Sequence, residues 1–313
     1  MNVQTIKGAI LGLATADALG VPVEFESRAR LKENPVTGMR SGGSWGQEAG
    51  TWSDDTTMTI ATMESIARLG GIDYADIMNN FLHWYEHDNF TATGELFDIG
   101  NTTRAALVRY SRKILPPTKC GATDENSNGN GSLMRILPAA LYLSARRGRI
   151  GSDELAVIHR FSALTHAHAV SKISCGIYSL VAAQILNGRT VRDAFTLAIE
   201  DAKKFYGNDD AFSHFARLCD EDFAALPEDE ISSGGYVLHT LEAALWCLLN
   251  TADYKSLALK AVNLGKDTDT TGAVAGGIAG LVYGAESIPA DWLAVLKRRD
   301  YLESLCEDFA AIL

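Results

Sequence analysis

The sequence is short of positive charge. Its 313 residues include 28 lysines and arginines against 39 aspartates and glutamates, which gives a formal net charge of −11 at pH 7. Proteins that grip a nucleic-acid backbone need clustered basic side chains. We therefore expect no nucleic-acid partner, although this balance still allows a local basic patch.

Paired cysteines are also missing. The five cysteines are an odd number, lie far apart in the chain and include no C-x-x-C spacing of the kind that holds a metal or forms a redox pair. They are typical of reduced thiols. We therefore expect a cytoplasmic protein.

No uninterrupted apolar run reaches the roughly 20 residues that a transmembrane helix needs. Residues 268–283 are too few and include an acidic side chain, Asp269, near their start. Near the N-terminus a lysine precedes an apolar segment, but Asp17 follows and no cleavage site is evident. We expect neither export nor membrane insertion.

The alternation of apolar and polar residues that marks β-strands is missing as well. Apolar residues instead recur at helical spacing in one segment after another. No internal repeat stands out beyond two similar acidic turns. With 47% hydrophobic residues the chain can bury a sizeable core. We therefore predict an all-α protein that forms a single compact domain over residues 1–313.

One acidic turn lies near the C-terminal end. Asp267 and Asp269 alternate with threonines at 268, 270 and 271, and the small, apolar residues 273–283 follow. Carboxylate and hydroxyl oxygens suit a hard cation such as magnesium, manganese or calcium. The same side chains also cap helices. Taken alone, this turn is better explained as a helix cap.

A second acidic turn changes that interpretation. Ser53, Asp54 and Asp55 precede the helical pattern of residues 59–69. One aspartate is enough to cap a helix, and a second beside it adds repulsion between like charges unless a cation compensates it. Two such turns, far apart in the sequence, indicate one site assembled from both ends of the chain, with enough ligands for two ions.

The segment from residue 6 to residue 20 has small and apolar residues at helical spacing. Small residues let another element approach closely, so we expect this helix to pack against residues 273–283.

Glu24 follows in the exit loop between two apolar neighbours. Its position allows either a surface acid without a function or a functional carboxylate. Residues 28–50 are rich in glycine, which predicts a long loop of the kind that often carries function.

Other segments offer further candidates. The glycine-rich residues 128–132 lead into an apolar helix expected over residues 133–142, and free N–H groups at a helix start can bind an anion such as phosphate. His166 lies at a turn before a helix, and Asp98 precedes one, where it has the simple alternative of a cap. Tyr236 follows two glycines and is either a stacking platform or the edge of the core.

Together these motifs resemble the ADP-ribosylglycohydrolases, of the dinitrogenase-reductase-activating type. The resemblance covers nearly the whole chain in the expected order, and the combination is specific although no single part is. It rests on residues 12–20 (G-x-x-x-x-D-A-L-G), 23–25 (VEF), 50–55 (GTWSDD), 130–135 (NGSLMR), 165–166 (TH) and 265–270 (GKDTDT).

The resemblance implies an all-helical enzyme with two divalent cations, magnesium or manganese, in a central cleft. It implies hydrolysis of the glycosidic bond between ADP-ribose and a modified protein side chain, with arginine favoured, or of a related small ADP-ribosyl compound. The same fold resembles an eye-lens crystallin, so the alternative is a catalytically inactive or merely ADP-ribose-binding relative. We expect a monomer.

The resemblance also implies roles for individual residues. Ser53 departs from the threonine often found at its position but keeps the hydroxyl. Metal ligands would be Ser53, Asp54 and Asp55 from the first turn and Asp267, Asp269 and Thr270 from the second, and the catalytic candidates are Glu24, Asp55 and Asp269. Substrate contacts would come from Asp98 near the leaving group, from Gly129, Asn130, Gly131 and Ser132 at the diphosphate, from His166 at the distal ribose and from Tyr236 at adenine.

Overall fold

Helices account for almost all the regular structure. In this computed structural model, which describes residues 1–113 and 115–313, no residue belongs to a β-strand, and the described chain has only three isolated β-bridges. This confirms the predicted all-α class. The α-helices of the described residues are α1 (Val3–Gly20), α2 (Arg28–Glu33), α3 (Asp54–Leu69), α4 (Tyr74–His87), α5 (Asn101–Ser111), α6 (Leu137–Arg147), α7 (Ser152–Ala163), α8 (Ala169–Leu186), α9 (Val191–Tyr206), α10 (Val237–Leu249), α11 (Tyr254–Asn263), α12 (Thr268–Tyr283), α13 (Ala290–Val295) and α14 (Arg299–Ala311).

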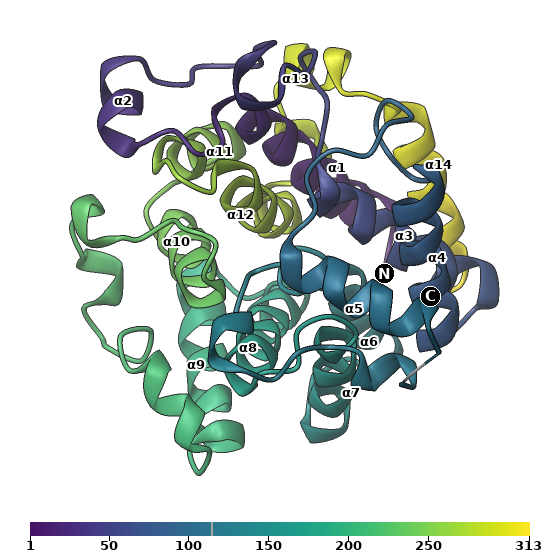
Figure 1. The fold of residues 1–313 in the computed structure, drawn as a ribbon. Helices are drawn as coiled ribbons and strands as arrows, with labels where there is room; N and C mark the ends of the chain where they lie inside the picture. Colours follow the sequence, from purple (N-terminus) through teal and green to yellow (C-terminus); the bar gives the residue numbers. More distant parts are fainter. Residues whose placement is uncertain (114) are drawn as a thin grey trace.

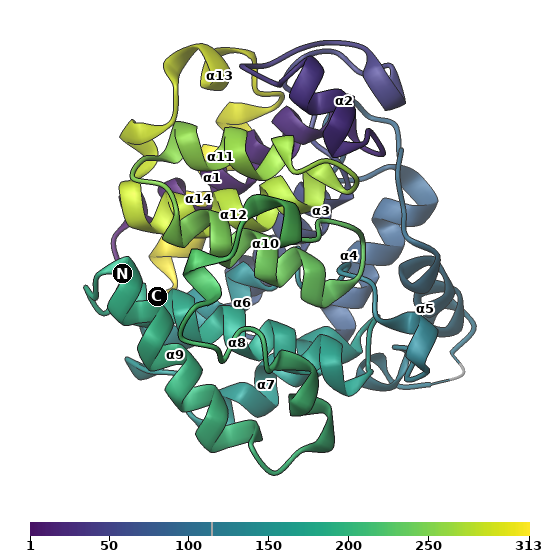
Figure 2. The same cartoon turned by 90° about the vertical axis from the view of Figure 1, so that its left-hand side faces the viewer.

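The two ends of the chain lie together in space. In Figure 2 the purple and yellow helices from the N-terminal and C-terminal parts form the upper half, and the teal and green helices α6 to α9 form the lower half. The two termini are neighbours in both views (Figures 1 and 2). This arrangement places α1, α3 and α12 side by side, although α12 begins more than two hundred residues after α1 ends.

Helices α1 and α12 pack against each other in antiparallel directions at unusually close range. A Cβ atom added to Gly8 would lie 2.4 Å from the carbonyl oxygen of Gly280, and one added to Gly12 would lie 2.5 Å from that of Gly276. At Gly20 it would lie 2.5 Å from backbone atoms of Thr268 and Asp269. Only glycine permits such backbone contact. The predicted packing of these two segments is therefore confirmed.

The remaining core is made of large apolar side chains from almost every helix, including the wholly buried Trp84, Phe81, Phe161 and Trp292. By length and hydropathy alone, residues 3–23 and α8 are long and apolar enough to cross a membrane, which the sequence analysis did not anticipate. In this fold, 94% and 72% of those two stretches are buried inside the protein. Their apolar surface is thus used for core packing.

Some helix boundaries differ from those expected. Helix α6 begins at Leu137, whereas the apolar pattern predicts a start at residue 133. Its second residue is proline, which favours the first turn of a helix because it has no N–H group to donate. Conversely, α3 and α12 begin earlier than expected. Asp54, Asp55 and Asp269 lie in their first turns.

Candidate functional site

The close contact of α1 with α12 brings three buried aspartates together. Asp17 lies in the last turns of α1, Asp55 in the first turn of α3 and Asp269 in the first turn of α12. One carboxylate oxygen from each lies within 4.8 Å of the others. Glu24, Asp98 and Asp269 form a second such group. The structure thus joins the two acidic turns predicted from the sequence.

Asp17 has no role in the sequence analysis beyond its place in a motif, although an acid inside an apolar helix is itself a signal. Its carboxylate accepts hydrogen bonds from the Ser53 N–H at 2.9 Å, the Thr56 N–H at 3.1 Å and the Thr56 hydroxyl at 2.6 Å. These donors belong to the start of α3. Asp17 therefore caps α3 from another helix and fixes the position of the first acidic turn.

The first acidic turn combines capping with open carboxylates. Ser53 is the N-cap of α3, and its hydroxyl donates to Asp55 Oδ2 at 2.9 Å. The Thr270 hydroxyl, 3.3 Å away, donates to the same oxygen. Asp54 faces the cleft beside the site. Ser53 therefore caps α3, while the Asp55 carboxylate contacts the second acidic turn through Thr270.

The second acidic turn is not explained by capping. Asp267 occupies the N-cap position of α12, but its side chain accepts no hydrogen bond from that helix. Its Oδ2 instead accepts from Asn130 Nδ2 at 2.9 Å. Three buried oxygens, Asp55 Oδ1, Asp267 Oδ1 and Asp269 Oδ2, have no hydrogen-bond partner among the described residues. Buried carboxylate oxygens without partners are costly, and bound cations would supply partners for them.

The electrostatics agree with that interpretation. Burial, reinforced by neighbouring carboxylates, raises the pKa of Asp54, Asp55 and Asp269 well above its usual range. Burial raises the pKa of Asp17 to about 7, although hydrogen bonds from Thr56 and Ser53 oppose the shift. So many acids cannot all be charged in one buried place unless positive charge compensates them. The residues present therefore fit divalent cations.

A cleft of about 400 Å³ opens above these acids. Its lining includes Glu24, Asp54, Asp98, Asp267 and Thr270 from the acidic group. Burial and the nearby Asp98 raise the pKa of Glu24 to about 9, and burial with the nearby Asp267 raises the pKa of Asp98 to about 6. Asp98 is not an N-cap, because α5 begins at Asn101 after Gly100.

The glycine-rich loop forms the opposite wall of the cleft. Asn130 N–H donates to Gly235 O at 3.1 Å, and Val237 N–H donates to Asn128 O at 2.9 Å. Gly129, Asn130 and Gly131 line the cleft. Ser132 does not reach it, since the residue is wholly buried and its hydroxyl accepts from Ser162 at 3.0 Å. The structure therefore brings Gly129, Asn130 and Gly131 to the site and leaves Ser132 in the core.

His166 lines the cleft and packs against this loop. A Cβ atom added to Gly131 would lie 2.9 Å from His166 Cε1. Burial and the nearby Arg135 lower the pKa of His166 to about 3, so the ring is neutral at physiological pH and carries one N–H. Tyr236 is not among the residues that line the cleft, although its neighbour Gly235 is; it is half-buried, with its ring edge-on to His239 at 5.0 Å.

A buried arginine orders the hydrogen bonds of this histidine. Arg135 Nη2 donates to the Thr165 hydroxyl oxygen at 2.8 Å, and that hydroxyl lies 2.8 Å from His166 Nδ1. Because the guanidinium is only a donor, the Thr165 hydroxyl hydrogen remains available for Nδ1. This arrangement favours the tautomer with the proton on His166 Nε2, which is the nitrogen nearer Gly129. This role of Arg135 and Thr165 depends on the fold and was not predicted from the sequence.

Replacing Thr165 with valine should disturb this tautomer. The substitution removes the donor to Nδ1 while keeping the side-chain shape, so the Nδ1-protonated form of His166 gains population. The ¹⁵N chemical shifts of the two ring nitrogens measure the change, and Thr165→Ser, which keeps the hydroxyl, is the matched control. Identical ring shifts in the valine and serine variants would contradict this assignment.

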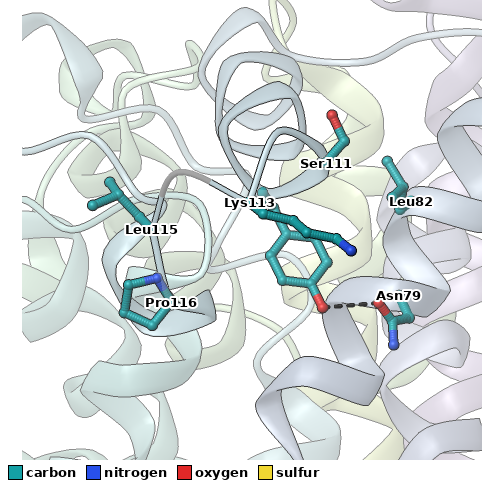
Figure 3. Close-up of a pocket in the computed structure, with 7 residues that line it drawn as sticks. Asn79, Leu82, Ser111, Lys113, Leu115 and Pro116 are labelled. Carbon is teal, nitrogen blue, oxygen red and sulfur yellow. Dashed lines mark hydrogen bonds between the residues drawn. The ribbon is translucent and has the colours of Figure 1, made fainter.

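Another cavity, of about 460 Å³, lies where the end of α5 faces α4. Figure 3 shows the residues that line it. The hydroxyl of Tyr110, which also lines it, donates to Asn79 Oδ1 at 2.8 Å. The described residues that line it include a lysine and no carboxylate. It therefore lacks the acid groups that distinguish the cleft at Asp269.

The all-helical fold and the joined acidic turns define a hydrolase of the ADP-ribosylglycohydrolase type. A family model described as ADP-ribosylglycohydrolase matches residues 3–313. The chain belongs to this family.

Named relatives support the assignment. The chain is 32% identical to ADP-ribosylarginine hydrolase Tri1 of Serratia proteamaculans, over 96% of this chain and 77% of the relative. It is also 32% identical to ADP-ribosyl-[dinitrogen reductase] glycohydrolase of Rhodospirillum rubrum, over 93% and 90%. A solved structure titled ADP-ribosylglycohydrolase-related protein complex superposes with a TM-score of 0.82 at 31% identity, over 99% of this chain and 98% of the other.

Proposed function

We propose that this enzyme hydrolyses the N-glycosidic bond between ADP-ribose and an arginine side chain of a modified protein, with two magnesium or manganese ions. The observation that carries the proposal is the set of three buried, unpartnered oxygens on Asp55, Asp267 and Asp269, which come from two turns that only the fold brings together. The arginine acceptor is supported by the relatives whose names specify ADP-ribosylarginine.

The proposed ions are held by the two acidic turns, with Ser53, Asp54 and Asp55 on one side and Asp267, Asp269 and Thr270 on the other. When bound, divalent cations supply Lewis acidity that orients hydroxyl groups and makes water more acidic. Asp17 is a positioning residue here, because its carboxylate oxygens already accept hydrogen bonds from the Ser53 N–H, the Thr56 N–H and the Thr56 hydroxyl.

Glu24 and Asp55 are the proposed acid–base pair around the bond that breaks. Trp45 Nε1 donates to Glu24 Oε2, so Oε1 is the oxygen left to carry a proton. With a pKa raised to about 9 by burial and by Asp98, Glu24 holds that proton at neutral pH and can give it to the departing acceptor. Asp55, which is deeper, accepts a proton from the attacking water.

The rest of the cleft suits ADP-ribose. In the described chain neither Gly129 N–H nor Gly131 N–H donates to a protein acceptor, so both are available to diphosphate oxygens. His166 Nε2–H is a donor for a ribose oxygen, and Tyr236 offers a ring for adenine. Ser132 contributes by supporting the loop from beneath. Asp98 lies at the acceptor end with Glu24.

The deciding experiment is an assay of released ADP-ribose from ADP-ribosyl-arginine, ADP-ribosyl-serine and O-acetyl-ADP-ribose, with magnesium or with EDTA. We expect release from the arginine compound with magnesium and none in EDTA. Preference for another of these compounds would show that its acceptor, and not arginine, is the one that the enzyme recognises. No release from any of the three would favour an inactive, ADP-ribose-binding relative, and full activity after EDTA treatment would refute the metal requirement.

Without metal, the protein should lose stability as pH rises. The folded-state pKa values of Asp98, Asp17 and Glu24 are raised to about 6, 7 and 9, so the folded state binds more protons than the unfolded state above about pH 4. Folding is therefore opposed increasingly between about pH 4 and pH 9. Thermal melts in EDTA should show Tm falling from about pH 5 to pH 8, and saturating magnesium should reduce that slope. A metal-independent slope would contradict the prediction.

We also propose a cytoplasmic monomer without a nucleic-acid partner. All five cysteines are free thiols, and only Cys219 is not fully buried, which supports a reducing compartment. Light scattering of the purified protein across a concentration series tests the monomeric state.

A further inference from the structure

Three aromatic side chains from separate segments lie together, and one of them, Phe25, lines the cleft. Phe25 and Trp45 have ring centroids 6.1 Å apart, and Trp45 and Phe97 have centroids 5.6 Å apart. The rings are tilted by 56° and 51° rather than stacked, so they do not cover each other's faces. We call these three residues the aromatic wall.

The position of Phe25 is maintained against two physical costs. Its side chain is 69% exposed, the most exposed large apolar side chain of the described protein. Its backbone has a positive φ of 67°, which is unfavourable for a residue with a Cβ atom. Two backbone hydrogen bonds hold it there, from Phe25 N–H to Lys266 O at 2.6 Å and from Lys266 N–H to Glu26 O at 2.7 Å. Strain of this kind is typical of functional sites.

The other two rings are tied to the acids of the cleft. Trp45 donates its indole N–H to the Glu24 carboxylate, and the Ser44 hydroxyl donates to the Glu24 carbonyl oxygen. Phe97 directly precedes Asp98, whose backbone also has a positive φ, of 51°. The aromatic wall therefore stands beside the carboxylates of Glu24 and Asp98, which both line the cleft.

The exposed Phe25 ring, next to two half-buried rings and the Asp98 carboxylate, matches one chemical class of ligand. A planar cation on an aliphatic stem binds ring faces through cation–π attraction and dispersion, and it binds carboxylates through charged hydrogen bonds. A guanidinium does both at once. A neutral hydroxyl acceptor such as serine offers neither the charge nor the planar group.

We propose that the aromatic wall is the acceptor subsite, which binds the guanidinium and stem of the arginine that carries ADP-ribose. This inference rests on the proposed function and adds to it the residues that select the acceptor. Asp98 provides the negative charge of the subsite and Glu24 lies beside it as the proton donor, while Phe25, Trp45 and Phe97 provide the rings.

The test compares Phe25→Leu and Phe97→Leu with Phe205→Leu. Phe205 is a partly exposed phenylalanine on α9, away from the cleft, so its variant controls for the loss of an exposed ring. For ADP-ribosyl-arginine we expect KM to rise about threefold to tenfold in each wall variant. The inhibition constant of free ADP-ribose, which has no acceptor, should stay within about twofold of wild type.

A binding experiment tests the subsite without turnover. Agmatine, a guanidinium on a short alkyl stem, is titrated into the ADP-ribose-saturated enzyme by calorimetry, and N-carbamoylputrescine serves as its neutral counterpart. We expect agmatine to bind wild type and Phe205→Leu, to bind the wall variants about threefold to tenfold more weakly, and to bind better than the neutral analogue.

Several outcomes would overturn the inference. Equal increases in KM and in the ADP-ribose inhibition constant would place the aromatic wall at the ADP-ribose end of the cleft. An unchanged KM in both variants would show that the aromatic wall does not bind the acceptor. Equal binding of agmatine and its neutral analogue would refute cation recognition. These failures differ from failure of the proposed function, in which the wild-type enzyme itself releases no ADP-ribose from ADP-ribosyl-arginine.

Discussion

Asp269→Asn should lower kcat/KM by at least about a thousandfold and yet stabilise the metal-free protein. The first effect follows because the variant loses a charged ligand shared by both acid groups. The second follows because Asp269 is wholly buried, and burial together with Glu24 and Asp55 raises its pKa well above the usual range. The asparagine amide places a donor where the unpartnered Oδ2 lies, so repulsion is replaced by hydrogen bonding.

Thermal melts in EDTA and in magnesium separate these effects. In EDTA the variant should be more stable than wild type by about 1–3 kcal/mol. Magnesium should raise the Tm of wild type and leave that of the variant nearly unchanged. Asp267→Asn with Asp269→Asn should abolish both turnover and metal stabilisation. The control is Asp291→Asn, an exposed acid on α13. A variant that is still stabilised by magnesium like wild type would contradict the assignment of Asp269 as a ligand.

Gly20→Ala should damage both the fold and the site. The added methyl group would lie 2.5 Å from backbone atoms of Asp269 and Thr268, which forces α12 away from α1. Such overpacking costs about 1–3 kcal/mol. Because Asp269 lies at the point of contact, its displacement should also reduce kcat/KM by about a hundredfold, as expected for a misplacement of about 1 Å.

Gly8→Ala is the matched comparison for this prediction. Its added methyl group would lie 2.4 Å from Gly280 O, so the crowding is similar, but it occurs at the opposite end of α1. We expect a comparable loss in urea denaturation and a kcat/KM within about threefold of wild type where the protein is folded. Equal losses of activity in the two variants would show that the glycine contact acts on stability alone.

The acidic turns show how far local sequence could lead. Adjacent Asp54 and Asp55 exceed what capping needs, so that turn indicated a cation, and it changed the interpretation of Asp267 and Asp269, which alone suggested a helix cap. The helix class followed from hydrophobic periodicity, because period is a local property. The α1–α12 contact was also predictable. Glycines at intervals of four residues lie on one face of a helix, and because they lack side chains that face can pack closely against another helix.

Other assignments failed or were missed because they depend on the direction in which a side chain points and on which elements the fold brings together. Ser132 belongs to the same loop as Gly131, but its side chain bonds Ser162 in the core rather than facing the cleft. Asp17 reads as a buried acid in a helix, and only the fold shows that it caps α3. The aromatic wall joins residues from separate loops with no shared pattern in the sequence.

The opening residues of α12, Asp267 to Thr270, combine both kinds of information. The sequence by itself determined the helical fold class, the two acidic turns and the close-packing glycines, because residue type and spacing encode these features. The tertiary structure alone decided that Asp55 and Asp269 become neighbours, that Asp267 is free of capping, and that Phe25 faces the cleft beside Asp98. The reason is that packing of α1 against α12 and the paths of the loops set these distances, and no local pattern records them.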